Sequence, residues 1–143
     1  ASPPGRRADM TLRAERLGRM ASLMKIQLRL SEWQLAQLRQ QEQNLQEEEA
    51  YLVTTLNERR LPMGSSSESI ARRLTTTGVG VRAVQAEASR QFDQVRAENR
   101  RVKHLEQIAR SAAAADLRDA ERRALEEMTN LHAGARDRTA PTG

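Results

Sequence analysis

Cysteine is absent from this chain of 143 residues, and its aromatic residues are one Phe, one Trp and one Tyr. Without thiols, neither a disulfide framework nor thiolate chemistry is available. So little aromatic mass also argues against an ordinary globular core. No apolar run approaches the ~20 residues that a helix needs to cross a bilayer. These absences favour long helices in a reducing compartment, and we expect a cytoplasmic protein.

Groups that could converge on a catalytic or metal site are also missing from the sequence. His104 and His132 lie far apart and have no metal-ligating neighbours, and the carboxylates of 47–49 have no histidine beside them. Gly78 and Gly80 follow no strand and lack the third glycine of a dinucleotide fingerprint. The sequence therefore predicts a protein that is not an enzyme, with no catalytic residues, no cofactor, no metal and no small-molecule substrate.

The charged residues make up 30% of the chain, with 24 basic and 19 acidic side chains. Lys25 and Lys103 are the only lysines, so arginine dominates; bidentate recognition of anions and codon bias in a GC-rich genome both explain this. Because acidic and basic residues alternate, the pattern favours a salt-bridged helix surface. Nucleic-acid binding is the weaker alternative, because no aromatics interleave with the basic clusters. These clusters are Arg72, Arg73 and Arg82, and Arg100, Arg101 and Lys103.

An apolar stripe with heptad spacing runs along the first part of the chain. Its members recur at steps of three, four or seven, which keeps them on one narrow face of a helix. They are Leu17, Met24, Leu28, Leu35, Leu38, Leu45, Leu52 and Leu56. A second series at heptad spacing comprises Val81, Val84, Ala88, Val95, Val102, Leu105, Ala109 and Ala112. So narrow a stripe needs a partner helix.

Proline, glycine and polar residues suggest the element boundaries. We expect a disordered tail over 1–9, a helical arm over 10–60 that ends before Pro62, a tip over 61–80, a second arm over 81–133 and a disordered tail over 134–143. Within the tip, Ser67 could cap a short helix over Glu68–Leu74. The predicted fold is all-α, a single antiparallel coiled-coil hairpin of two long helices with a short helix or loop at its tip.

The pairing of the two arms has one preferred register and one competitor. A reversal near residue 68 would set Leu56 against Val81 and large side chains against small ones. The competing structure is a parallel dimer in which the first stripe meets its own copy. Polar residues at seam positions weaken both structures, although in a thin pair of helices they could reach water. They are Ser31, Glu42, Glu49, Gln91 and Glu98.

A second apolar face occurs on the first arm, outside the stripe. Its residues follow each other at steps of three and four, which is helical spacing. One interpretation is a wider local core, covered by the far end of the chain. The other is an exposed surface for a partner protein, with Trp33 as its first candidate anchor. The face comprises Leu23, Ile26, Leu30 and Trp33.

The segment Asp119–Met128, near the end of the second arm, mixes charges with leucine. With the hairpin architecture and the chain length, it resembles the flagellar export protein FliJ and the YscO-like proteins of type III secretion. The glycine-containing tip and the alanine-rich 111–115 depart from that family. The residues expected to contact a partner here are Glu121, Arg122, Arg123, Leu125, Glu126 and Met128.

This resemblance implies a non-enzymatic stalk or adaptor in a bacterial export apparatus, flagellar or injectisome. Its partners would be the export ATPase hexamer, the export gate membrane protein and the export chaperones, and it would lie in the cytoplasm, peripheral to the inner membrane. The end formed by Met10–Leu30 and Asp116–Leu131 would enter the ATPase ring. The alternative is a generic homodimerising coiled-coil scaffold.

Overall fold

The computed structural model describes residues 4–139 and consists there of two α-helices with no strand. Helix α1 spans Pro4–Glu58 and helix α2 spans Ser67–Thr139, and the side chains of residues 12–136 are described. Contacts divide the chain into two compact units. The terminal unit comprises Ala1–Leu23 and Val102–Gly143, and the tip unit is Met24–Arg101. The expected all-α pair of long helices is confirmed.

The helix boundaries differ from the expected ones. Helix α1 begins at Pro4, before the expected start at residue 10, because proline is favoured in the first turn, where its missing N–H is not needed. Helix α2 continues through Gly134, where a stop was expected. A glycine inside a helix costs only about 1 kcal/mol relative to alanine. The tail segments 1–3 and 140–143 lie outside the described residues.

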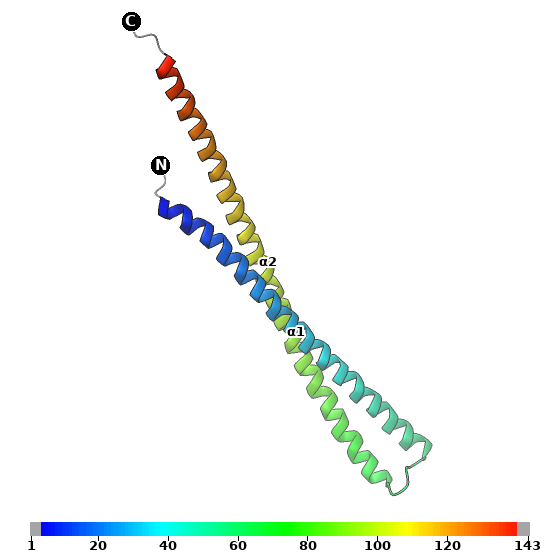
Figure 1. Cartoon of the computed structure of the whole chain (residues 1–143). Coiled ribbons are helices and arrows are strands. Elements are labelled where there is room, and N and C mark those ends of the chain that lie inside the picture. The colour runs from blue at the N-terminus through cyan, green and yellow to red at the C-terminus, as the bar shows by residue number, and fades with distance from the viewer. Residues whose placement is uncertain (1–3, 140–143) are drawn as a thin grey trace. The chain divides into compact units, whose positions relative to one another are not determined.

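A tight connection joins the two helices in the tip unit (Figure 1). Helix α1 ends at Glu58, and Arg59 follows with a φ of 52°, in the left-handed region. A turn then closes through the bond from Ser65 N to the Pro62 carbonyl at 3.0 Å. Gly64 takes the third position of this turn with a φ of 82°, a value that glycine adopts without strain.

Helix α2 starts with a reciprocal cap. The backbone N–H of Ser69 donates to Ser66 Oγ at 3.1 Å, and the N–H of Ser66 donates to Ser69 Oγ at 3.2 Å. This pattern is a capping box, which satisfies two amides that the first turn leaves unpaired. The cap residue is therefore Ser66 and not Ser67, and the expected short helix does not stop at Leu74.

The segment 75–80 was expected to be irregular and is helical. The hydroxyls of Thr75 and Thr76 donate to the carbonyls four residues earlier, and Thr77 is buried. Seam spacing continues through Ile70, Leu74, Thr77 and Val81, all of which are buried or half-buried. Packing against α1 thus outweighs the low helix propensity of threonine and glycine here.

The seam of the tip unit follows heptad spacing on both helices, which run antiparallel (Figure 1). Each seam residue is buried or half-buried, and Leu52 is only 2% exposed. On α1 they are Met24, Leu28, Ser31, Leu35, Leu38, Glu42, Leu45, Glu49, Leu52 and Leu56. On α2 they are Ile70, Leu74, Thr77, Val81, Val84, Ala88, Gln91, Val95 and Glu98.

The pairing register differs from the expected one. A Cβ on Gly80 would lie 3.7 Å from Leu45 Cδ1, and Gln85 Nε2 donates to Glu42 Oε1 at 3.1 Å. The midpoints of these pairs fall near residue 63, inside the observed connection and not near residue 68. Leu56 therefore cannot face Val81. The register was wrong because α2 begins at Ser67 and not at Val81.

Polar residues bridge the two helices of the tip unit and support this register. Gln91 Nε2 donates to the Ser31 carbonyl at 3.0 Å and lies 3.3 Å from Gln34 Oε1. The ring of Phe92 lies below two guanidinium groups, those of Arg39 and Arg96, at 5.8 and 5.7 Å from its centroid. Each such cation–π contact contributes about 0.5–1 kcal/mol at an exposed site.

The expectation that seam polar groups reach water is wrong for Ser31, which is 3% exposed, and for Glu98. Glu98 is 5% exposed, and its Oε2 atom is buried without a hydrogen-bond partner. The heptad placed Glu98 at the seam correctly, but neighbouring side chains close over it. An unpaired buried polar atom costs roughly 1–3 kcal/mol, so this residue lowers the stability of the tip unit.

Candidate protein-binding surfaces

The second apolar face of α1 is exposed and forms a surface that we name the α1 ridge, consisting of Leu23, Ile26, Leu30 and Trp33. Helical periodicity places these residues outside the seam, because their positions differ from those of Met24, Leu28 and Ser31. The exposed fractions of the four ridge residues are 66, 61, 54 and 59% in chain order. Each of these side chains is more than half exposed, which favours the interpretation as a surface for a partner protein over that of a wider local core.

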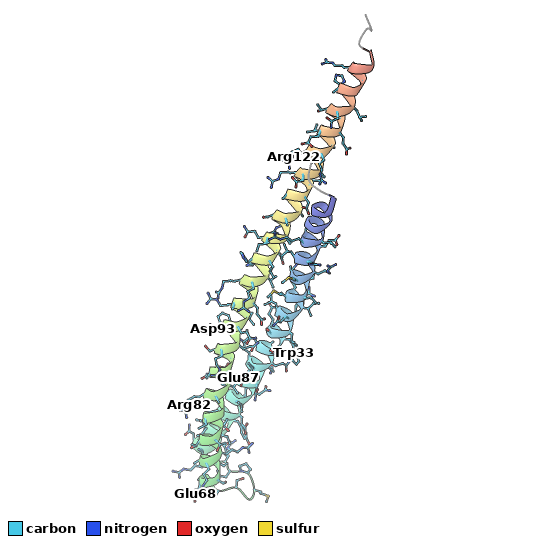
Figure 2. All side chains as sticks on the ribbon, turned by 90° about the vertical axis from the view of Figure 1, so that its left-hand side faces the viewer. Trp33, Glu68, Arg82, Glu87, Asp93 and Arg122 are labelled. Atoms are coloured by element: carbon cyan, nitrogen blue, oxygen red, sulfur yellow. The ribbon has the colours of Figure 1, made fainter. Side chains whose placement is uncertain are left out.

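Trp33 projects from α1 on the side away from α2 (Figure 2). Along the ridge direction the next residues are Gln37 and Gln40, so the apolar surface ends shortly after the tryptophan. A large aromatic side chain with an apolar body and a polar N–H suits the centre of a protein interface. The ridge is therefore an apolar surface that is bounded by amides at its carboxyl-terminal end.

The terminal unit contains a groove between its two helices. Arg13 and Leu17 of α1 line this groove together with five residues of α2, most of them small or apolar. These residues are Ile108, Ser111, Ala112, Ala115 and Asp116. The run 111–115 is thus where small side chains let α1 approach α2. Asp116 lies level with Arg13, whereas a reversal near residue 68 would set Arg13 against Ala124, so the expected register is wrong here too.

In the terminal unit, the last described turns of helix α2 lie beyond Pro4, the first described residue of helix α1. Figure 2 places Arg122 just past the point where the described part of α1 begins, at Pro4. About 18 residues of α2 remain, roughly 27 Å of helix. Every described residue from Ala124 to Arg136 is exposed. We name residues 122–139 the projecting end.

Most of the predicted partner residues of α2 lie on or beside this projecting end. Leu125 and Met128 are 65 and 67% exposed, and Glu121, Arg122 and Glu126 are also exposed. Arg123 is half-buried, because it occupies the last seam position of α2, and its Nε donates to the Asp119 carbonyl at 3.0 Å. The Arg122 guanidinium pairs with the Asp119 carboxylate at 2.7 Å. The structure does not bring this set into one unit with Trp33, since they belong to different units.

The basic cluster near the tip is paired with carboxylates. Arg73 donates through Nε and Nη2 to Glu48 Oε1 at 3.0 and 2.7 Å, which ties α2 to α1. Arg72 pairs with Glu68 at 2.7 Å within α2. Two of the three arginines expected around the tip are thus engaged with acidic side chains, and this local neutralisation weakens the nucleic-acid alternative.

Other kinds of site were also sought among the described residues. No group of three or more His, Cys, Asp or Glu side chains there could hold a metal ion. Within the same residues, no helix is both long and apolar enough to cross a membrane. The tip carries one feature that heptad spacing did not reveal: Met63 is fully exposed beside the positive-φ residue Gly64.

The fold and these surfaces define a two-helix coiled-coil protein with exposed apolar surfaces suited to protein binding. Comparison with protein-family models, curated proteins and solved structures found no match to this chain. The resemblance to FliJ and the YscO-like proteins therefore depends on the segment Asp119–Met128 and on the helical hairpin.

Proposed function

We propose that this protein is a non-enzymatic stalk or adaptor of a bacterial type III export apparatus, and that its projecting end binds the hexameric export ATPase. One observation carries the proposal. The mixed-charge segment that resembles the export family lies where α2 runs past α1, with Leu125 and Met128 exposed on a single helix. An exposed helix with apolar and charged side chains can enter a groove or ring of another protein.

The α1 ridge is a second contact surface in this proposal. Apolar side chains that remain in water on a helix favour burial against a partner. A stalk that meets the ATPase with one surface still needs another for the export gate or for chaperones. The ridge supplies such a surface, and Trp33 would be its anchor.

The test is binding of the purified chain to an export ATPase, measured by co-elution and by the ATPase rate. We expect a complex, and a changed rate of ATP hydrolysis because a stalk acts on the ring that it enters. In the double variant Leu125→Glu and Met128→Glu, affinity should fall about tenfold or more, since two anchors become charged.

Val79→Glu is the matched control for that variant. Val79 is an exposed apolar residue of the same helix, 54% exposed, but it belongs to the tip unit. The control should bind within about twofold of the unchanged chain, a free-energy difference of under 1 kcal/mol. Equal losses in both variants, or no complex with any export ATPase tested, would rule out this function for the projecting end.

A further inference from the structure

Five residues of α2 form an apolar stripe that is symmetric about its centre. On either side of Ala124, an apolar residue recurs four positions away and another seven positions away. At ~100° per residue all five fall within an arc of about 80°. All five are exposed, and the three large ones are 61, 67 and 73% exposed. This α2 stripe consists of Leu117, Ala120, Ala124, Met128 and Leu131.

The described side chains of helix α1 leave the α2 stripe exposed. In the terminal unit the seam of α2 ends with Asp116, Asp119 and Arg123, which are half-buried. Ala120 and Ala124 each follow a seam residue by one position, so the stripe lies roughly 100° around the helix from the seam. The beginning of α1 therefore packs about a quarter turn away. A helix approaching the stripe would not collide with α1.

We propose that the α2 stripe pairs with the α2 stripe of a second copy of this chain, antiparallel, with a two-fold axis at Ala124. The symmetry of the stripe is the reason for proposing a second copy of the chain as its partner. Reversal of the second helix sets Leu117 against Leu131, Ala120 against Met128, and Ala124 against itself. Large side chains then meet small ones at the Ala120 level, and the two alanines at the axis allow close approach.

Charge complementarity supports the antiparallel direction. Arg123 and Glu127 flank the stripe on the same side of the helix, and the two-fold axis places each Arg123 near Glu127 of the other copy. Symmetry creates this pair twice. In the structure Arg123 uses its Nε for the Asp119 carbonyl. A guanidinium has four further N–H donors, so it can also meet a carboxylate.

The contact area sets the strength of this pairing. The stripe spans 15 residues, roughly 22 Å of helix, and a contact between two such segments is smaller than the ~1,600 Å² of a standard interface. The dimer is therefore weak and reversible, and it forms at high protein concentration. This inference goes beyond the proposed function and does not depend on it.

Disulfide trapping tests the two-fold axis, because the chain contains no cysteine of its own. Ala124→Cys places one thiol on the axis, within reach of its copy. Arg122→Cys is the matched control, because it is exposed and only two positions away but points roughly 160° from the stripe centre. Under mild oxidation, Ala124→Cys should form covalent dimer at least about tenfold faster than Arg122→Cys. Equal rates would overturn the proposal.

A second pair of variants tests the direction. Leu117→Cys and Leu131→Cys should each cross-link poorly alone, because like residues lie 14 positions, or about 21 Å, apart in the antiparallel pair. A mixture of the two should cross-link readily. Self-cross-linking of Leu117→Cys as fast as the mixture would show a parallel pair and overturn the proposal. Failure to bind an export ATPase leaves these cross-linking results unchanged, so the two proposals fail separately.

Discussion

Gln94 satisfies only one of the two carboxylate oxygens of Glu98. Its Nε2 donates to Glu98 Oε1 at 3.1 Å, while Glu98 Oε2 is buried with no hydrogen-bond partner. Glu98 lies at a seam position. The core of this fold consists of one row of seam side chains on each helix. Since desolvation of an unpaired carboxylate oxygen is unfavourable, this single residue lowers the free energy of unfolding noticeably.

Replacement of Glu98 should therefore stabilise the protein. Glu98→Met keeps an unbranched side chain of similar length and removes both oxygens, so the free energy of unfolding should rise by about 1–3 kcal/mol. Urea unfolding followed by circular dichroism measures this change. Glu87→Met, at an exposed position of the same helix, should change it by less than about 0.5 kcal/mol. A drop in stability for Glu98→Met would mean that a partner in solution satisfies Oε2.

Chemical cross-linking can verify the register of the tip unit. A short cross-linker with two thiol-reactive methanethiosulfonate groups should join Leu45→Cys to Gly80→Cys, because these positions are in contact across the seam. The pair Leu56→Cys and Val81→Cys should remain unlinked, since Leu56 lies 11 positions, or about 16 Å, along α1 from Leu45. Linking of the second pair and not of the first would restore the register centred on residue 68.

The sequence predicted which residues of the tip unit face the seam but not their pairing. Apolar spacing identified seam positions, including the polar ones Ser31 and Glu98. The register depends on where α2 begins, and Thr75–Thr77 with two glycines suggested a loop there. The spacing of Ile70, Leu74 and Thr77, in phase with Val81, was the signal that the helix continues. The packing of these residues against α1 outweighed the low helix propensity of the threonines and glycines.

The exposed surfaces were predictable in part. Residues out of phase with the heptad, such as Ile26 and Trp33, were recognisable as a second apolar face. Spacing within one helix does not reveal whether another segment covers that face, because this depends on the register and the relative arm lengths. The position of the projecting end depends on the same fact, since an earlier start of α2 moves Asp116 level with Arg13.

Truncation of a leucine should lower the free energy of unfolding strongly at the seam and hardly at all on the ridge. Leu52 is 2% exposed, so Leu52→Ala removes buried methyl groups and should lower the free energy of unfolding by about 2–4 kcal/mol. Leu30→Ala makes the same chemical change on the same helix and in the same unit, but Leu30 is 54% exposed. Its effect should be under about 0.5 kcal/mol. Thermal melts of both variants give the comparison, and a large effect at Leu30 would show that the ridge is covered in solution.

Trp33 is the only tryptophan of the chain, and so it reports directly on the ridge. Because it is 59% exposed, its fluorescence maximum in the isolated protein should be close to that of free tryptophan and should hardly shift on unfolding. A partner that covers the ridge should move the maximum to shorter wavelength, since the indole leaves water.

Trp33→Ala should then weaken the binding of that partner by about tenfold or more, with helicity unchanged. Tyr51→Ala, at an exposed aromatic residue of the same helix and unit, is the control and should bind within about twofold. A blue-shifted maximum in the isolated chain, or a loss of helicity in Trp33→Ala, would instead make Trp33 part of a core.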